Sequence, residues 1–177
     1  MKIMIASDIH GSAWYCRELV NAWEREKADK LLLLGDILYH GPRNDLPREY
    51  APKEVIAMLN PLAPYILAVR GNCEAEVDQM VLDFSVMADY IALFADGITM
   101  YATHGHLDPV KGIPGLQKGD VVLQGHTHVP KMEEKNGCFF MNPGSVSIPK
   151  EKSEHGYMIF EHGKFYWKNL EGTIYQP

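Results

Sequence analysis

Cysteine is scarce in this sequence. The chain of 177 residues has three cysteines, Cys16, Cys73 and Cys138, and no two of them are spaced as a CxxC pair. This count argues against a disulfide framework, and the spacing argues against a structural zinc or redox site. Cys16 falls in an apolar helical stretch and Cys138 opens an apolar strand, so both are expected to be small residues of the core.

Long apolar runs and an excess of basic residues are also missing. No stretch approaches the roughly 20 apolar residues that a membrane span requires, and the apolar start of the chain is too short for a signal peptide. We therefore expect a cytoplasmic protein without membrane contact. Lysine and arginine total 17 against 23 acidic residues, which gives a formal net charge of -6. Without a basic stripe, stable nucleic-acid binding through counterion release is not expected.

Internal repeats, low-complexity tracts and linkers are absent as well. A chain of this length with 46% apolar residues can bury one core of its own, so we expect a single domain over residues 1–177. In the first half, residues 2–7 and 31–34 are apolar runs separated by a helical pattern from Gly11 to about Lys27. A second helix is expected to begin at Ala51-Pro52, and residues 65–69 are expected to form a strand.

The apolar residues of these two helices predict which sides are buried. Those expected to face inward are Trp14, Leu19, Val20, Trp23, Val55, Ile56, Met58 and Leu59. Strand, helix and strand in this order are typical of a βαβ opening with buried parallel strands.

The second half predicts hairpins instead. Three pairs of strand-like segments flank a two-residue turn, at Asp96-Gly97, Asn136-Gly137 and His162-Gly163. The predicted pairs are 90–95 with 98–102, 131–135 with 138–141, and 156–161 with 164–169. A βαβ half followed by a hairpin half favours an α/β protein with two facing sheets and helices outside.

Histidines and carboxylates are concentrated in five short clusters. In chain order they are Asp8-Ile9-His10, Gly35-Asp36, Gly71-Asn72-Cys73-Glu74, Thr103-His104-Gly105-His106 and Gly125-His126-Thr127-His128. Neutral imidazoles and hard oxygen atoms are ligands of divalent first-row metals. A single histidine after a strand is ordinarily a surface or satisfied polar residue. Five such clusters in order at strand ends, however, predict a two-metal hydrolase.

These motifs resemble the signature of the calcineurin-like metallophosphoesterase superfamily, in which DxH, GD, GNH(D/E), a later histidine segment and GHxH follow one another. The resemblance covers essentially the whole chain. It is closest to the small YfcE-type phosphodiesterases, through His40-Gly41-Pro42-Arg43-Asn44, Gly71-Asn72-Cys73 and Asn142-Pro143-Gly144-Ser145. It implies a four-layer αββα sandwich of two facing mixed β-sheets with helices outside, and a dinuclear metal site.

The resemblance also assigns the metal ligands. Asp8, His10 and His128 would hold one ion, Asn72, His104 and His126 would hold the other, and Asp36 would bridge both. A bridging carboxylate keeps two cations about 3.5–4 Å apart and offsets their repulsion. Mixed imidazole and oxygen ligands suit Mn, Fe, Co, Ni or Zn, and the resemblance favours two Mn2+ ions. In an acidic protein, such ions would supply the positive charge that a phosphate ester needs.

The activity implied is that of a phosphoric diester hydrolase acting on small molecules, by in-line attack of a metal-bridging hydroxide. The residues expected to take part in catalysis are Asp36, Asn72, Cys73 and His104. Cys73 departs from the pattern, because the superfamily usually has a histidine there to protonate the leaving alcohol. A thiol with a pKa of about 8.5 could donate a proton, and it could equally be a small space-filler. We therefore expect a preference for acidic leaving groups.

Four further residues are candidates for substrate binding. His40, Arg43 and Asn44 lie in the long loop after Asp36, and the guanidinium of Arg43 offers a bidentate fork suited to phosphate. A plain surface loop is the alternative. His106 lies two residues from His104, and it could approach the substrate or pack behind the metal ligands. The segment Asn142–Ser145 is expected to be a tight turn that supports the site.

Two other functions fit the same fold. The small retromer scaffold subunit resembles this family yet serves as a protein-binding module, so the fold alone does not establish catalysis. A phosphomonoesterase or nucleotidase would use the same metals. This chain keeps all seven ligand positions, which favours catalysis over a scaffold. A homodimer or higher homo-oligomer is compatible with the sequence.

Overall fold

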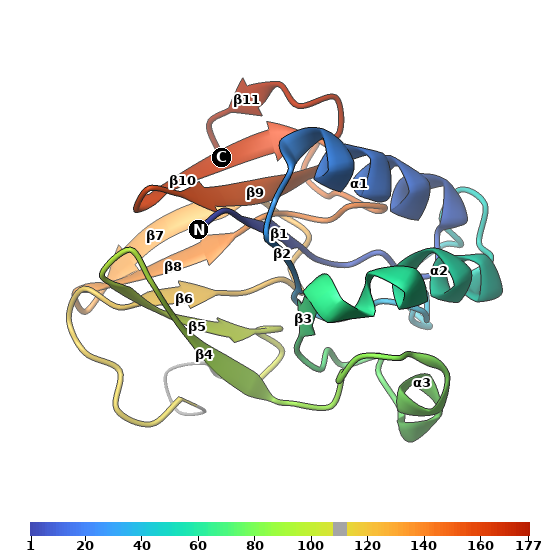
Figure 1. The fold of residues 1–177 in the computed structure, drawn as a ribbon, viewed down its shortest axis with the longest axis horizontal. Helices are drawn as coiled ribbons and strands as arrows, with labels where there is room; N and C mark the ends of the chain where they lie inside the picture. Colours follow the sequence, from blue (N-terminus) through green and yellow to red (C-terminus); the bar gives the residue numbers. More distant parts are fainter. Residues whose placement is uncertain (108–112) are drawn as a thin grey trace.

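The computed structural model describes residues 1–107 and 113–177, which form two facing mixed β-sheets (Figure 1). The first sheet has six strands in the order β11-β10-β9-β1-β2-β3. They are β1 (Ile3–Ala6), β2 (Lys30–Leu33), β3 (Ile66–Ala68), β9 (Gly156–Glu161), β10 (Lys164–Asn169) and β11 (Ile174–Tyr175). Strands β1, β2 and β3 are parallel, as expected for a βαβ opening, and β9 pairs antiparallel with β1.

The second sheet has five strands in the order β4-β5-β6-β8-β7. They are β4 (Tyr90–Ala95), β5 (Ile98–Thr103), β6 (Val121–Leu123), β7 (Lys131–Lys135) and β8 (Cys138–Asn142). Strand β6 runs parallel to both of its neighbours. All three predicted hairpins are confirmed, as β4–β5, β7–β8 and β9–β10. Their turns have positive φ at both central residues, for example 57° at Asn136 and 81° at Gly137, as a type I′ turn requires.

Two α-helices lie along one side of the first sheet (Figure 1). Helix α1 (Ala13–Glu26) begins where the Ser12 side chain accepts a hydrogen bond from Tyr15 N–H, and it ends at Lys27 in the left-handed conformation. Helix α2 (Pro52–Leu59) starts with the predicted proline and continues into a 3₁₀ helix, η1 (Asn60–Tyr65). A short helix, α3 (Glu76–Val81), follows β3. None of the helices in the described residues has the length and apolar content that crossing a membrane demands.

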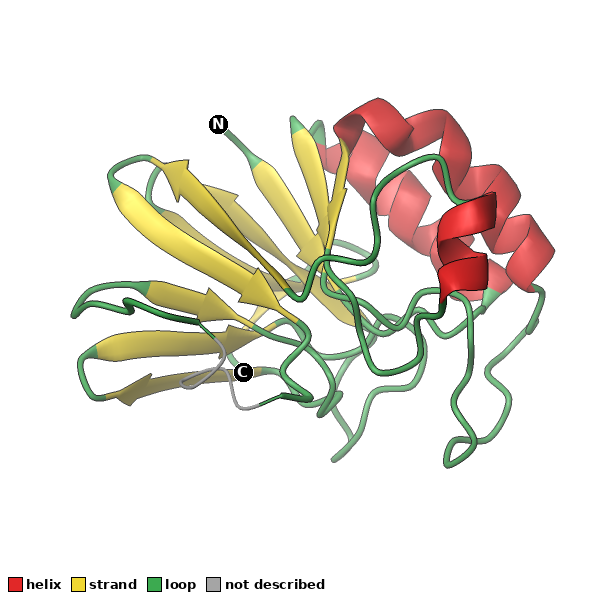
Figure 2. Cartoon of the chain, turned by 90° about the horizontal axis from the view of Figure 1, so that it is seen from below, coloured by secondary structure: helices red, strands yellow, loops and turns green. Residues whose placement is uncertain are grey.

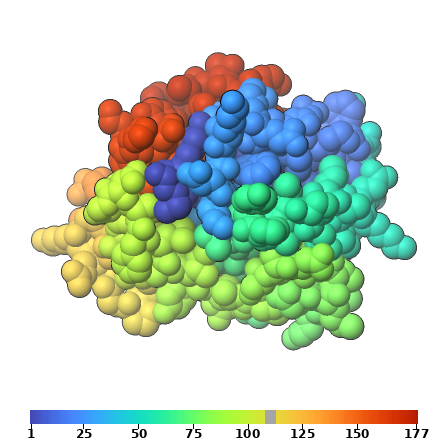
Figure 3. Space-filling model, viewed as in Figure 1, coloured from blue at the N-terminus to red at the C-terminus, as the bar shows by residue number. Residues whose placement is uncertain are grey.

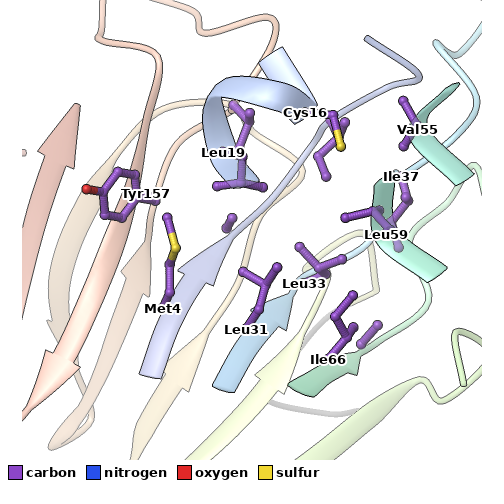
Figure 4. Close-up of a cluster of buried hydrophobic side chains, with 14 of the residues drawn as sticks. Met4, Cys16, Leu19, Leu31, Leu33, Ile37, Val55, Leu59, Ile66 and Tyr157 are labelled. Carbon is purple, nitrogen blue, oxygen red and sulfur yellow. The ribbon is translucent and has the colours of Figure 1, made fainter. Parts of the chain in front are cut away.

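Alternate residues of the central strands face opposite layers. Met4, Leu31 and Leu33 pack with Leu19 and Leu59 of the helices (Figure 4). Their neighbours in sequence point the other way, and this set packs between the two sheets; it includes Ile3, Ile5, Leu32, Met100 and Leu123. The period of two along each strand therefore produces two core layers from the same short apolar runs.

The outer face of the second sheet is also covered. Val122, Cys138 and Phe140 pack there with Ile113 and the partly buried Leu116, which belong to the segment before β6. The expected α/β sandwich of two facing mixed sheets is confirmed, with helices α1 and α2 forming its outer layer on the first sheet (Figure 2). Cys16 and Cys138 are buried, as expected.

One helix residue does not lie where the pattern predicts. Trp14 is half-buried rather than part of the core, and the guanidinium of Arg48 lies 3.2 Å from the centre of its ring. Leu19 is fully buried, and Val20 and Trp23 pack at the edge of the core. The inward prediction for Trp14 is wrong because an arginine from the loop before α2 covers the indole, which a helical period does not reveal.

Candidate metal centre

All seven predicted metal ligands follow strands at one edge of the two sheets. Residues 8 and 10 follow β1, residue 36 follows β2, residue 72 follows β3, residue 104 follows β5, and residues 126 and 128 follow β6. Because β1, β2 and β3 are parallel, their carboxyl ends open at the same edge, and β5 and β6 are parallel likewise. In Figure 2, loops collect at this end of the sheets.

Six of the seven side chains converge there in two groups. In the first, His128 Nε2 lies 3.2 Å from both Asp8 Oδ1 and His10 Nε2. In the second, His104 Nε2 lies 3.1 Å from Asn72 Oδ1. Asp36 Oδ2 stands between the groups, 3.6 Å from His10 Nε2 and 3.4 Å from His104 Nε2. A single carboxylate oxygen thus faces both groups.

The three buried histidines share one orientation. The Nδ1 atom of His10 donates to the Tyr39 carbonyl at 2.8 Å, that of His104 donates to the Leu34 carbonyl at 2.6 Å, and that of His128 donates to the Ile148 carbonyl at 2.8 Å. A carbonyl can only accept, so the proton of each neutral ring is on Nδ1. Each Nε2 then presents a lone pair to the centre, the usual arrangement for metal-ligating histidine.

The backbone at these positions is strained. Five of the seven residues have positive φ, between 50° and 66°: Asp8, His10, Asp36, His126 and His128. The left-handed region disfavours residues with a Cβ by roughly 1–2 kcal/mol each. Strain of this kind persists where the surrounding structure forces it and is concentrated at functional sites.

The side chains that converge fit a cation. Asp8 Oδ2 accepts hydrogen bonds from Ser7 Oγ and His126 N–H, but the buried Asp8 Oδ1 has no hydrogen-bond partner among the described residues. An anionic oxygen facing imidazole lone pairs is costly to bury unless positive charge lies between them. Divalent ions would supply that charge, so the donor set fits the metals that the sequence predicts.

The pKa values of Asp8 and His104 show the effect of opposite charge at this buried site. Burial by itself would raise the pKa of Asp8, but the adjacent imidazoles of His10 and His128 outweigh it and hold the pKa below its ordinary value. Burial would lower the pKa of His104, yet the neighbouring Asp36 raises it to about 9. The centre therefore favours carboxylate anions beside positive charge.

His126 stands slightly apart from the other ligands. Its ring centre lies 5.1 Å from that of His104 and 6.3 Å from that of His106. Within the described residues, the histidine, cysteine and carboxylate atoms that lie close enough together to hold an ion belong to Asp8, His10, Asp36, Cys73, His104 and His128. The side chain of His126 instead lines the cavity above them.

Hydrogen bonds from neighbouring residues support the backbone of the loops that carry the ligands. Ser145 Oγ donates to the Asp8 carbonyl at 2.8 Å, and Asn142 Nδ2 donates to the Gly125 carbonyl at 2.7 Å. Because Gly144 has a φ of +85°, this segment turns sharply between them, in line with its predicted supporting role. A Cβ at Gly125 would overlap the side chains of Ser7 and Asp8, so only glycine allows this close approach.

A polar cavity of about 340 Å3 opens over the centre. Of the predicted substrate-binding residues, Arg43 and Asn44 line it, together with Asp36, Asn72, His126, Thr127, His128 and Lys150. Lys150 was missed by the sequence reasoning. Its backbone N–H donates to the His128 carbonyl, so the chain returns to the site 22 positions after His128. No motif marks this lysine, and its only sequence signal is a charge shortly after Asn142–Ser145.

Comparison with known proteins decides the family. The calcineurin-like phosphoesterase superfamily domain matches residues 1–164. This chain belongs to that superfamily. The phosphodiesterase YfcE of Escherichia coli K12 is 43% identical over 162 residues, covering 92% of this chain and 88% of the relative. A solved structure of the E. coli YfcE phosphoesterase superposes with a TM-score of 0.93 at 41% identity, covering 98% of this chain and 96% of that one. The phosphodiesterase MJ0936 of Methanocaldococcus jannaschii is 26% identical, covering 91% of this chain and 100% of the relative.

In this phosphoesterase, Cys73 lies directly beside the centre. Its backbone N–H donates to Asp36 Oδ1 at 2.9 Å, and its Sγ accepts from Asn72 Nδ2 at 3.2 Å. Burial and the negative charge of Asp36 raise the pKa of the Cys73 thiol. A thiol that holds its proton tightly is a poor donor, which leaves the side chain better suited to filling space than to acid catalysis.

Two other residues expected near the substrate, His40 and His106, are not among the described residues that line the polar cavity. The ring of His40 packs between those of Tyr39 and Tyr50, with centre distances of 4.7 Å and 5.2 Å, and it is not among the residues that line the polar cavity. His106 is half-buried with its ring 5.5 Å from that of His104, the arrangement expected if it packs behind a ligand. Burial and the adjacent His104 lower its pKa. The roles proposed for both from the sequence stay predictions.

Proposed function

We propose that this phosphoesterase is a metal-dependent phosphodiesterase that hydrolyses small-molecule phosphate diesters. One observation carries the proposal: a single carboxylate oxygen of Asp36 faces two groups of electron-rich atoms, around Asp8 and around Asn72. A shared carboxylate between two ligand groups is what a two-metal clamp for one phosphate requires. The names of YfcE and MJ0936 as phosphodiesterases support the same reaction.

The residues would divide between two ions as follows. Asp8, His10 and His128 would hold one ion, Asn72, His104 and His126 would hold the other, and Asp36 would be shared. The bound ions would neutralise phosphate charge and lower the pKa of a water molecule, which makes it a nucleophile for in-line displacement at neutral pH. Mixed nitrogen and oxygen donors suit first-row metals, of which we propose Mn2+.

The protein's own side chains would orient the ligands and bind the substrate. The three Nδ1–carbonyl hydrogen bonds keep the imidazoles neutral and pointed inward. Arg43 and Lys150, which both line the polar cavity, would bind the non-bridging oxygens of the phosphate and fix its orientation. Cys73 would fill the space where a proton donor could stand, so the leaving alcohol would depart without strong acid catalysis.

Several properties complete the proposal. We propose a single cytoplasmic domain that needs neither a membrane nor nucleic acid. A homodimer or higher homo-oligomer is compatible with the site, because the residues described above all come from one chain. A phosphomonoesterase would use the same ligands, and substrate comparison separates the two.

Hydrolysis of bis(p-nitrophenyl) phosphate tests the proposal. The protein is stripped with a chelator and assayed with and without added Mn2+, beside an Asp36→Asn variant. Activity is expected only with metal and is expected to disappear in Asp36→Asn, because the amide removes the shared anionic ligand. p-Nitrophenyl phosphate serves as the monoester comparison, and a higher kcat/KM on the monoester would overturn the diesterase assignment.

The scaffold alternative has its own outcome in this experiment. A protein that binds Mn2+ in calorimetry yet remains inactive on both diesters and monoesters would contradict catalysis. Capture of a protein partner would then be the next step.

A further inference from the structure

A second cavity lies beside the metal centre and differs from it in character. Its volume is about 620 Å3, and Asn72 lines both this cavity and the polar one. Cys73 and Glu74 lie on the side of the metal centre, and the far walls come from the loop after Asp36, from α2 and from α3. A molecule bound at the metals can therefore extend into this space without leaving the protein surface.

The far walls are apolar, and part of their apolar surface is exposed. Tyr39, Val77 and Val81 line the cavity while remaining 42%, 59% and 39% exposed. Ile56 of α2 faces the same space. Helices α2 and α3 appear as neighbours on the face shown in Figure 3. A concave apolar surface next to a reactive centre is typical of a small-molecule subsite.

The walls are held in place by polar contacts outside the cavity lining. Asn60, at the end of α2, donates from Nδ2 to the Val81 carbonyl at 2.9 Å and accepts from Asp83 N–H at 3.1 Å. The end of α3 is thereby tied to the end of α2. The subsite is preformed and does not require ordering of the chain by a ligand.

The charges at the cavity define what it can hold. No lysine or arginine is among its described lining residues, and its two acidic residues are Glu74 and Asp78. Glu74 accepts hydrogen bonds from three backbone N–H groups, and Asp78 accepts from Ala75 N–H. These carboxylates would repel an anion, and no cationic side chain among the described lining residues offsets them. The occupant is therefore not an anion, and the mostly apolar lining favours an uncharged group.

Aromatic rings define its shape. Tyr39 and Tyr50 both line the cavity, and each packs edge-on against His40, at interplanar angles of 67° and 79°. The two tyrosines are thus braced through a shared ring behind the wall. Flat aromatic groups pack favourably against such rings in offset or edge-to-face contact.

We propose that this cavity, lined by Tyr39, Tyr50, Ile56, Val77 and Val81, is a specificity subsite for an uncharged aromatic ring on one ester arm of the diester substrate. The ring could be a simple aryl group or a nucleobase, since both offer the same flat, neutral surface. The inference rests on the proposed function, because the phosphate must be held at the metals for its arm to reach the cavity. It identifies aromatic diesters, rather than short dialkyl diesters, as the substrate class.

Equilibrium binding of diesters to the Mn2+-loaded protein, measured before appreciable hydrolysis, tests the subsite. Diphenyl phosphate is expected to bind about ten-fold or more tightly than dimethyl phosphate by calorimetry, because burying one ring removes substantial apolar area from water. Methyl phenyl phosphate and the methyl ester of adenosine 5′-phosphate distinguish aryl from nucleobase occupancy. If either compound binds more tightly than dimethyl phosphate, the subsite is supported, and the compound that binds more tightly identifies the ring that the cavity takes. Equal affinity of diphenyl and dimethyl phosphate would overturn it.

A matched pair of variants on α3 locates the effect. Val77→Glu places a charge in the cavity and should remove most of the preference for diphenyl phosphate, while inorganic phosphate binds as before. Met80→Glu is the control, since Met80 lies on the same helix, is 82% exposed and is not among the lining residues. Val81→Glu repeats the test if Val77→Glu folds poorly. Preference retained in both cavity variants would reject this location.

These outcomes are separable from failure of the proposed function. If no diester is hydrolysed in the presence of metal, the function fails, whatever the binding preference. If bis(p-nitrophenyl) phosphate is hydrolysed but diphenyl phosphate shows no advantage over dimethyl phosphate, only the subsite is rejected.

Discussion

The carboxylate of Glu74 accepts a hydrogen bond from the backbone N–H of Asp36 at 2.9 Å. It also accepts from the N–H groups of Ile37 at 2.7 Å and Gly71 at 2.5 Å. Asp36 itself has a φ of 53°. Glu74 therefore joins the strained loop of Asp36 to the loop after β3.

Replacing Glu74 by glutamine should weaken metal binding without unfolding the protein. An amide has one acceptor oxygen and brings an NH2 group against backbone donors, so Asp36 loses part of its support. We expect Mn2+ affinity to fall by about 10–100-fold, as is usual when a partner behind a ligand is lost. Calorimetric titration of the chelator-stripped variant measures this. Glu76→Gln, at an exposed acid of α3, is the control. Unchanged affinity in Glu74→Gln would show that the support is dispensable.

Replacing Cys73 by histidine should raise the rate on diesters with alkyl leaving groups. A protonated imidazole beside Asp36 can give a proton to a departing alkoxide, a contribution of roughly 10²–10⁴-fold in favourable cases. Aryl leaving groups need little help, so the rate on bis(p-nitrophenyl) phosphate should change less. Phosphorus NMR follows both reactions, and Cys73→Ser controls for the loss of sulfur. Equal wild-type rates on aryl and alkyl diesters would count against this interpretation of Cys73.

Truncating Arg43 or Lys150 should weaken substrate binding while leaving the metals in place. Both line the polar cavity, and their cationic side chains do not ligate a metal ion. We expect KM to rise roughly ten-fold in Arg43→Ala and in Lys150→Ala, on the scale of one charge-assisted hydrogen bond at a partly exposed site. Steady-state kinetics with parallel metal analysis measures this. Arg48→Ala, which loses a contact to Trp14 instead, should leave KM unchanged.

Metal should stabilise the fold measurably. The buried Asp8 Oδ1 has no hydrogen-bond partner among the described residues, and His128 Nε2 lies 3.2 Å from it and from His10 Nε2, so a cation between them would satisfy these atoms. At a free Mn2+ concentration 100 times the Kd, linkage adds about 2.7 kcal/mol to the free energy of unfolding, visible as a higher Tm in calorimetry. Excess chelator should reverse the shift, and Asp36→Asn should reduce it. A Tm that does not respond to any divalent first-row ion would contradict the metal site.

Acid stability should depend on Glu26, far from the metals. Its carboxylate contacts Lys168 at 2.7 Å, Tyr157 at 2.8 Å and Lys2 at 3.0 Å. Burial alone would raise the pKa of Glu26, but these three partners lower it from 4.5 to about 2. A lowered pKa stabilises the folded state above the unfolded pKa, and this contribution disappears as the pH falls from about 4.5 towards 2.

The variant Glu26→Gln should therefore be less stable near neutral pH by roughly 1–3 kcal/mol, the range for hydrogen bonds to a charged group. Its deficit against wild type should shrink between pH 4.5 and pH 2 in urea unfolding experiments. Glu24→Gln, an exposed position on the same helix, should show no such trend. A deficit that stays constant over this pH range would mean that lost packing, rather than lost charge, is responsible.

The local patterns of the sequence predict much of the fold. The turns at Asn136-Gly137 and its two counterparts specify their hairpins, because positive φ at consecutive residues suits few amino acids and determines the register of the flanking strands. The parallel opening follows from short apolar runs separated by an amphipathic helix. Trp14 escaped prediction because Arg48, more than thirty residues away, covers it.

By itself, the sequence determined the chemistry of the centre: which donors are present, and that each follows a strand, so that parallel pairing brings them to one edge. Only the tertiary structure decided their support and surroundings. Contacts between distant segments place Asp36 between the two groups of ligands and bring Glu74 into hydrogen-bond contact with its backbone. Such contacts also bring Lys150 to the polar cavity and form the apolar cavity beside α2 and α3. Ligand identity is carried by the residue type itself, whereas position and cavity shape arise from packing between elements that no local pattern records.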